Sequence, residues 1–147
     1  MIEVQMYAHE VDSNVDLSTC GLGPCVGIVV GYNGRVSMYH APMPNAGDIS
    51  FFDALDASIP YADRSNVHPI LAGCHTCRTS PDKDIMQTRL WVEKKLSGMG
   101  FGASVVMWGD GSDIASQNLR TSISKGEVVL EKYDWDNHVG SQIIRLW

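Results

Sequence analysis

The stretch VGIVVGYNGRVSMYH, residues 26–40, carries the strongest structural signal in the chain. Two runs of β-branched and aromatic residues, Val26–Tyr32 and Arg35–Tyr39, flank the dipeptide Asn33-Gly34. An Asn-Gly dipeptide between such runs favours a tight β-hairpin turn, because both central residues of that turn need a positive φ. The sequence therefore predicts an antiparallel hairpin here.

A two-residue loop also sets which residues of the hairpin face each other. Tyr32 is expected opposite Arg35, and stepping outward along the strands brings Gly27 opposite His40. Cys25 lies two residues beyond Gly27 on the same strand, and side chains alternate between the two faces. Cys25 and His40 are therefore expected to be diagonal neighbours on one face. Gly27 has no side chain and is expected to leave the space between them open.

A cysteine next to a histidine is a candidate nucleophile, because the imidazole can take the proton of the thiol. The preceding segment Gly21-Leu22-Gly23 offers backbone N–H groups that can face an oxyanion. Pro24 has no N–H group, so the N–H of Cys25 is the more favoured donor. Taken alone, these residues support core packing of Cys25 and His40 as well as they support catalysis.

The rest of the chain predicts a mixed α+β domain with more strands than helices. Further strands are expected at Glu3–His9, His68–Thr76, Ala103–Trp108, Gly126–Lys132 and Ser141–Leu146. Helices are expected from about Ser80 to Ser97, at Asp113–Ser124, and as a short piece around Phe51–Leu55 within a long irregular region.

The composition is typical of one globular domain covering residues 1–147. Hydrophobic residues make up 44% of the chain, which is enough to close a core without disulfides. The net charge of −6 argues against a nucleic-acid partner, because phosphate-binding surfaces carry an excess of lysine and arginine. No apolar run approaches the length of about 18 residues that a membrane span requires.

Residues 1–6 lack the basic start and the apolar stretch of a cleavable signal peptide. We therefore expect a cytoplasmic protein, or an effector secreted without such a signal. Free thiols are expected at all four cysteines, Cys20, Cys25, Cys74 and Cys77, because the oxidising context of a disulfide framework is missing. No metal or organic cofactor is expected, and the sequence does not decide the oligomeric state.

Two short segments resemble a known family. The run Thr19-Cys20-Gly21-Leu22-Gly23-Pro24-Cys25-Val26, followed by the hairpin and by His40-Ala41-Pro42-Met43-Pro44, resembles the CheD chemoreceptor glutamine deamidases. The pairing of cysteine and histidine also resembles that of the cytotoxic necrotizing factor toxins, which deamidate a glutamine of small GTPases. The resemblance is specific across residues 19–44 and general beyond them. It implies a layered β-sandwich flanked by helices.

The resemblance also implies roles for individual residues. Cys25 is implied as the nucleophile and His40 as the base, with Thr19 as the third residue that orients the histidine. Gly23 and Pro24 are expected to border the bound substrate, a partner protein that carries a reactive glutamine. Pro24 stands where the family has serine, and residues 45–84 match no pattern of the family. The implied target is therefore a protein glutamine, and not necessarily that of a chemoreceptor.

Cys20 is a second candidate nucleophile, because Leu17-Ser18-Thr19-Cys20 resembles the Leu-Ser-Gly-Cys motif of the toxins. The hairpin register favours Cys25, since Cys20 precedes the hairpin and is not expected to meet His40. Three other functions remain open at this point. They are a different cysteine amidohydrolase, a transglutaminase, and a binding domain that keeps the fold without catalysis.

The segment Cys74-His75-Thr76-Cys77 is a Cys-x-x-Cys pair, which occurs in zinc sites and in redox proteins. Structural zinc needs four ligands and usually two such pairs, and the flanking sequence lacks a thioredoxin-like βαβ unit. A metal or redox role for this pair is therefore the weaker interpretation.

Overall fold

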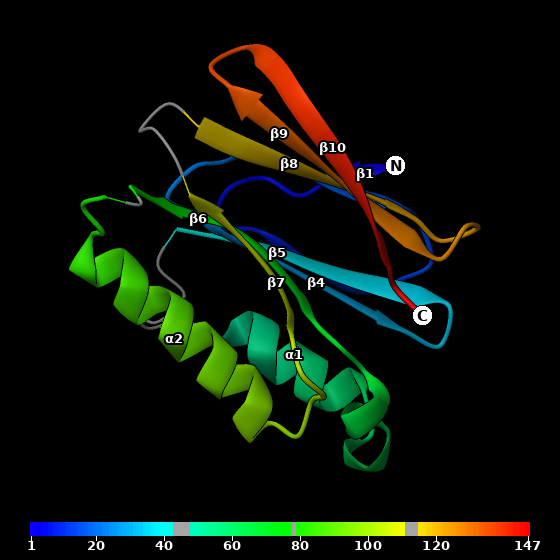
Figure 1. The fold of residues 1–147 in the computed structure, drawn as a ribbon. Helices are drawn as coiled ribbons and strands as arrows, with labels where there is room; N and C mark the ends of the chain where they lie inside the picture. The colour runs from blue at the N-terminus through cyan, green and yellow to red at the C-terminus, as the bar shows by residue number, and fades with distance from the viewer. Residues whose placement is uncertain (43–47, 78, 111–114) are drawn as a thin grey trace.

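The computed structural model describes residues 1–42, 48–77, 79–110 and 115–147. These residues form an α+β fold in three layers, with two five-stranded sheets face to face and helices along the outer side of one sheet (Figure 1). The predicted α+β class, with more strands than helices, is confirmed. No helix in the described part of the chain is long and apolar enough to cross a membrane.

The first sheet has the strand order β1-β3-β8-β9-β10, and the second has the order β2-β5-β4-β6-β7. The pairs β1–β3 and β6–β7 are parallel, whereas the other neighbours are antiparallel. The strands are β1 Ile2–Glu3, β2 His9–Ser13, β3 Leu17–Leu22, β4 Val26–Tyr32, β5 Arg35–Ala41, β6 Ile70–Thr76, β7 Val105–Asp110, β8 Ala115–Ser122, β9 Glu127–Asp134 and β10 Asn137–Arg145.

The helices are α1 Ser50–Ser58, the 3-10 helix η1 Tyr61–Asn66, and α2 Lys83–Gly98. Helix α2 matches the predicted helix, and it begins where the Asp82 carboxylate accepts hydrogen bonds from the N–H groups of Asp84 and Ile85. Helix α1 includes the short helix expected around Phe51–Leu55.

Two clusters of buried apolar side chains hold the three layers together. One lies between the second sheet and the helices and includes Ile28, Tyr39, Phe51, Phe52, Leu71 and Leu96. The other lies between the two sheets and includes Leu17, Val29, Met38, Ala72, Leu119 and Leu130. The second sheet is therefore covered on both faces, which explains why β4 is apolar at nearly every position.

The predicted hairpin is confirmed in both turn and register. Asn33 and Gly34 have φ values of 53° and 72°, as the tight turn requires. Tyr32 pairs with Arg35, and Gly27 pairs with His40. The prediction that Gly27 leaves open space is wrong. A Cβ atom at this position would lie 2.6 Å from a terminal carbon of Leu22 and 3.0 Å from one of Leu119, so these leucines fill the space.

The predicted single strand at Glu3–His9 is also wrong. The chain leaves the first sheet after Glu3 and joins the second at His9, passing through a turn in which the N–H of Ala8 donates to the carbonyl of Gln5 (2.9 Å). Tyr7 has a φ of 71° in this turn, a conformation that an extended strand does not allow. The N-terminal segment therefore crosses from one sheet to the other.

The helix predicted at Asp113–Ser124 is wrong for its described residues. Residues 115–122 form strand β8, which pairs with β3 on one side and β9 on the other. Residues 113 and 114 lie outside the described residues. Alternating burial of Gln117, Leu119 and Thr121 shows the period of a strand with one face against the core. Sheet pairing thus overrides the local helix-start signal.

Strand β6 contains a bulge where it passes the start of β4. Gly73 and Cys74 have φ values of 73° and 50°, and the pairing of β6 with β7 shifts between Gly73 and Thr76. The Cys74 N–H donates to the carbonyl of Cys25 (2.8 Å). A Cβ atom at Gly73 would lie only 2.3 Å from that carbonyl oxygen, so this position requires glycine.

We predict that Gly73→Ala lowers the free energy of unfolding far more than Gly34→Ala does. Both glycines have nearly the same positive φ, but nothing lies within 4 Å of a Cβ at Gly34. Gly34→Ala should therefore cost only the left-handed strain of about 1–2 kcal/mol. Gly73→Ala should cost at least about 3 kcal/mol, because contact with the Cys25 carbonyl is added. Urea unfolding of both variants measures the difference, and equal losses would contradict the bulge geometry.

Candidate active site

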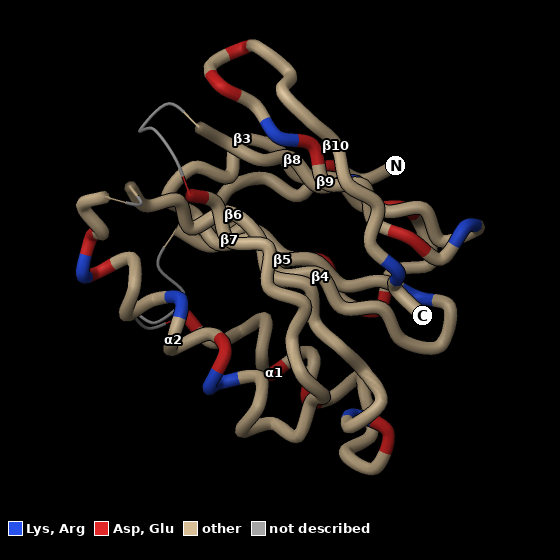
Figure 2. The backbone as a smooth tube through the Cα atoms, viewed as in Figure 1, with Lys and Arg blue, Asp and Glu red and all other residues tan. Residues whose placement is uncertain are grey.

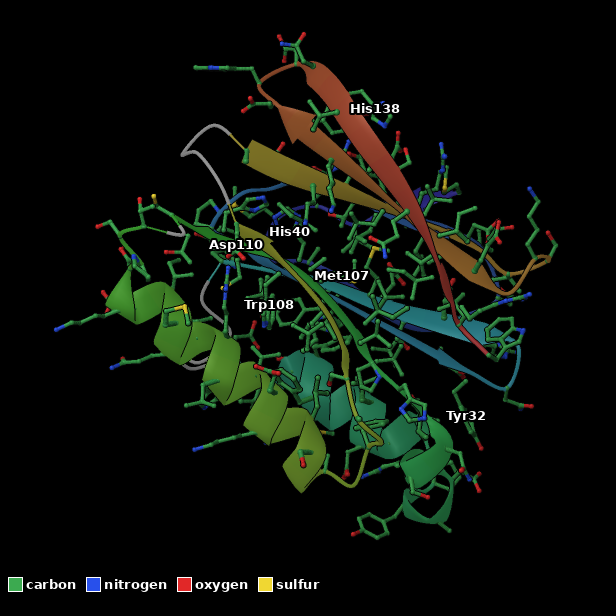
Figure 3. The ribbon with its side chains drawn as sticks, viewed as in Figure 1. Tyr32, His40, Met107, Trp108, Asp110 and His138 are labelled. Carbon is green, nitrogen blue, oxygen red and sulfur yellow. The ribbon has the colours of Figure 1, made fainter. Side chains whose placement is uncertain are left out.

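His40 lies on β5, faces the layer between the two sheets, and is only 4% exposed (Figure 3). Its ring contacts a residue of the opposite sheet, Thr19 on β3, with 2.7 Å between Nδ1 and the threonine Oγ1. Thr19 is itself buried and points inward, since β3 alternates buried Leu17 and Thr19 with the more exposed Ser18 and Cys20. The structure thus joins Thr19 and His40 across the sandwich.

A second hydrogen bond of Thr19 determines the tautomer of His40. The Thr19 hydroxyl donates to the backbone carbonyl of Val4 (2.7 Å), and a carbonyl oxygen can only accept. With its one proton used, the hydroxyl accepts from His40, so Nδ1 carries the ring proton. The Nε2 atom of the neutral ring is then unprotonated. Nε2 is buried and has no hydrogen-bond partner among the described residues.

Cys25 immediately precedes β4 and belongs to the cluster between the sheets. Because Gly27 pairs with His40, the cysteine and the histidine share one face of the hairpin, as predicted. The sulfur lies 3.9 Å from the Sδ atom of Met6, and Cys25 is only 6% exposed. Met6 belongs to the N-terminal crossing segment and thus covers the thiol. No sequence signal indicated this role of Met6.

The thiol of Cys25 and the imidazole of His40 are both uncharged in this arrangement. Burial raises the pKa of the Cys25 thiol and lowers the pKa of His40. The proton therefore rests on sulfur, and His40 keeps a free lone pair on Nε2. Proton transfer would then accompany attack by sulfur rather than precede it. Catalytic hydrogen bonds commonly tighten only when substrate is bound.

The glycine-bearing loop before Cys25 is held by its own hydrogen bonds. The N–H of Gly23 donates to the carbonyl of Gly21 (2.9 Å), and the N–H of Gly21 donates to the side-chain oxygen of Asn118 (3.0 Å). These two N–H groups are engaged within the protein. They do not face an oxyanion in this arrangement, which leaves the Cys25 N–H as the favoured donor. Pro24 lies between Gly23 and Cys25 and donates no hydrogen bond.

Cys20, the second candidate nucleophile, lies apart from this site. It is exposed on β3, two sequence positions after Ser18 and on the outward side of the strand, opposite to the inward Thr19. Its sulfur lies 3.4 Å from a carboxylate oxygen of Glu3. Partial burial raises the pKa of this thiol, and the hydrogen bond and charge of Glu3 raise it further. This surrounding disfavours a thiolate at Cys20.

The Cys-x-x-Cys pair is not arranged around an ion. Cys74 is buried toward α2, where its sulfur lies 3.7 Å from the carbonyl oxygen of Ile85, whereas Cys77 lies 3.3 Å from the Thr79 hydroxyl. Burial raises the pKa of the Cys74 thiol to about 11. Among the residues that the structure describes, no group of three or more histidine, cysteine or acidic side chains is placed to hold a metal ion.

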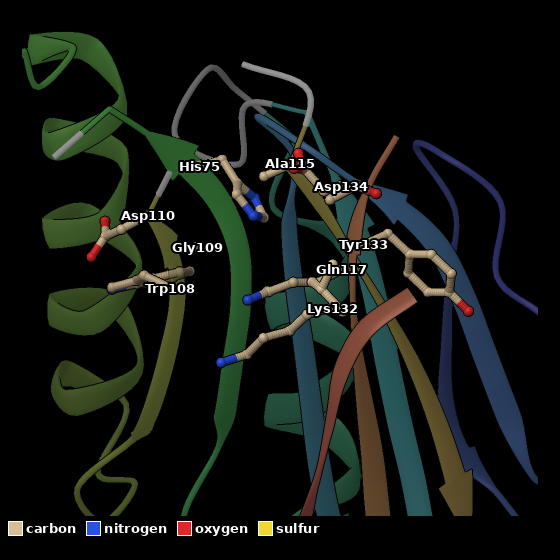
Figure 4. Close-up of a pocket in the computed structure, with 11 residues that line it drawn as sticks. His75, Trp108, Gly109, Asp110, Ala115, Gln117, Lys132, Tyr133 and Asp134 are labelled. Carbon is tan, nitrogen blue, oxygen red and sulfur yellow. The ribbon is translucent and has the colours of Figure 1, made fainter. Parts of the chain in front are cut away.

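A separate cleft of about 340 Å³ opens between the two sheets (Figure 4). Its walls come from β6 and β7 on one side and from β8, β9 and β10 on the other. Residues lining it include His75, Trp108, Asp110, Gln117, Lys132 and Tyr133. Cys25 and His40 do not line it, so the cleft is not the space around the thiol.

Basic and acidic residues are interspersed along the described backbone. Figure 2 shows lysines and arginines spread over α2, loops and strand ends, with acidic residues among them.

Comparison with protein-family models and with curated proteins finds no match to this chain. The functional argument therefore rests on the residues themselves and on how the fold brings them together.

We predict that Met6→Ala increases the rate at which iodoacetamide alkylates Cys25, by about threefold or more, because thiol reactivity follows exposure. Alkylation of each cysteine can be followed separately by peptide mass spectrometry. Met86→Ala is the matched control, since Met86 is an exposed methionine on α2 whose sulfur contacts Arg89 rather than Cys25. An unchanged Cys25 rate in Met6→Ala would show that Met6 does not cover the sulfur.

Proposed function

We propose that this protein is a protein-glutamine deamidase that uses Cys25 as nucleophile and His40 as general base and acid. The observation that carries this proposal is the pair of 2.7 Å hydrogen bonds at Thr19, one to His40 Nδ1 and one to the Val4 carbonyl. Together they leave Nε2 unprotonated on the face that also bears Cys25. A cysteine, a base and an orienting group are the parts that nucleophilic catalysis needs.

In the proposed reaction, Leu22 moves out of the space beside Gly27, and the sulfur of Cys25 attacks the carboxamide carbon of a glutamine side chain while its proton passes to His40 Nε2. The Cys25 N–H donates to the oxyanion that forms. The carbon–nitrogen bond then breaks, and His40 returns the proton to the departing amine, which leaves as ammonia. A thioester remains on Cys25.

Water completes the cycle. His40 Nε2 takes a proton from a water molecule as its oxygen attacks the thioester carbon. The carbon–sulfur bond then breaks, and His40 returns this proton to the sulfur, which releases glutamate and restores the thiol. The net reaction consumes one water and releases one ammonia. Throughout, the Thr19 oxygen accepts from Nδ1–H, which keeps the ring oriented in both its neutral and its protonated form.

The choice of glutamine as substrate is supported by the resemblance across residues 19–44. The same chemical groups would also serve another cysteine amidohydrolase or a transglutaminase. A transglutaminase differs in one step, because an amine rather than water attacks the thioester. Product analysis therefore separates these activities.

We predict that the protein converts specific glutamines in a cell extract to glutamate, a mass gain of about 1 Da, and that Cys25→Ala lowers this conversion by at least about 100-fold. Cys20→Ala is the matched control and should keep most of the activity, because Cys20 faces away from Thr19. Quantitative mass spectrometry of tryptic peptides measures both.

Three results would count against the proposal. Loss of conversion in Cys20→Ala but not in Cys25→Ala would show that Cys20, and not Cys25, is the nucleophile. Adducts of larger mass on glutamine would indicate a transglutaminase. If the extract treated with wild-type protein and the extract treated with Cys25→Ala show the same conversion of glutamine to glutamate, the proposal of a deamidase loses its support.

A further inference from the structure

We propose that His75 on β6 is a positioning residue that holds the loop carrying Cys25 in place. This inference rests on the proposed function, because it takes Cys25 as the nucleophile. The chemistry described above assigns no role to His75 or to the Cys-x-x-Cys segment in which it lies.

His75 makes two contacts with one oxygen atom, the backbone carbonyl oxygen of Gly23. The backbone N–H of His75 donates to the carbonyl of Gly23 (2.9 Å), and the ring atom Nδ1 lies 3.1 Å from the same oxygen. Since a carbonyl oxygen only accepts, Nδ1 carries the proton of the neutral ring. A carbonyl has two lone pairs, so both bonds can form together.

The same strand also holds the cysteine itself. The N–H of Cys74 donates to the carbonyl of Cys25 (2.8 Å), so consecutive residues of β6 bind the loop on either side of Pro24. Pro24 cannot donate, and the N–H of Gly23 is used inside the loop. The carbonyls of Gly23 and Cys25 are therefore the groups through which β6 holds this segment.

The His75 ring packs against Gly109, a position where only glycine leaves room for it. A Cβ atom at Gly109 would lie 2.1 Å from Nε2 of His75, closer than any real contact. The ring therefore lies directly against the backbone of β7. Burial lowers the pKa of His75, which keeps the ring neutral near pH 7.

The bulge behind His75 is rigidly held, so the ring bond acts on the loop rather than on β6. Arg89 of α2 donates from Nε and Nη2 to the carbonyl of Cys74 (3.0 and 2.8 Å) and from Nη2 to that of Gly109 (2.7 Å). The N–H of Gly73 donates to the Gln117 side chain (2.6 Å). Removing only the ring bond leaves these contacts and the backbone bond of His75 in place.

The test compares two substitutions that differ in where they place a donor. In His75→Asn the amide nitrogen occupies the position of Nδ1 and can keep the bond to Gly23, whereas in His75→Gln it reaches farther and cannot. Each is made with His40 intact and with His40→Ala. The readout is the rate of Cys25 alkylation by iodoacetamide near pH 7, with the thermal midpoint measured alongside.

We expect His75→Gln to slow alkylation by about two- to tenfold when His40 is present, as fits the loss of one hydrogen bond. His75→Asn should stay within about twofold of the wild type. In the His40→Ala background neither should change the rate, because the benefit of positioning is to align Cys25 with His40. Gly109→Ala keeps His75 but displaces its ring, so it should slow alkylation of Cys25 as much as His75→Gln does. It replaces His75→Gln in the comparison if that variant does not fold.

The inference is overturned if His75→Asn and His75→Gln, or His75→Asn and Gly109→Ala, slow alkylation equally. It is also overturned if the effect is the same with and without His40, which would indicate a general loosening of the fold. A different result would show that the proposed function itself is wrong. In that case His40→Ala alone leaves the Cys25 rate of the wild type unchanged.

Discussion

The hydrogen bond between Thr19 and His40 connects the two sheets at the point where the proposed chemistry occurs. Thr19 comes from β3 of the first sheet and His40 from β5 of the second, so the bond forms only when both sheets are packed face to face. The backbone carbonyl of Val4, on the segment that crosses between the sheets, completes the arrangement by accepting a hydrogen bond from the threonine hydroxyl. A neutral threonine supplies orientation rather than charge, which agrees with the uncharged state that burial favours for both Cys25 and His40.

Around the thiol, neighbouring side chains and backbone pack directly against two glycines, Gly27 and Gly73. Leu22 and Leu119 fill the space above Gly27, and Gly73 lies against the carbonyl of Cys25. Strand β6 therefore runs close enough to donate two backbone hydrogen bonds to the loop before β4. The proposed nucleophile, Cys25, is thus held by a strand distant in sequence, and the proposed base, His40, lies on the neighbouring strand of the same hairpin.

Local signals explain which parts of this arrangement the sequence predicts. Asn33-Gly34 determines the turn, and the turn with strand alternation determines the shared face of Cys25 and His40. The Asp82 cap similarly marks the start of α2. Non-local contacts explain the failures. The crossing at Gln5–Ala8 requires a positive φ at Tyr7, for which tyrosine gives no signal, and β8 is a strand because β3 and β9 pair with it. The contact of His75 with Gly23 joins segments far apart in sequence.

The central claim is that Thr19 and Val4 hold His40 as the tautomer with its proton on Nδ1. Nitrogen NMR of the protein labelled with ¹⁵N-histidine reads this directly, because the two ring nitrogens differ strongly in chemical shift when only one carries a proton. At neutral pH the account predicts a protonated Nδ1 and an unprotonated Nε2 for His40. A proton found on Nε2 instead would contradict it, since Nε2 could then no longer take the proton of Cys25 in the proposed reaction.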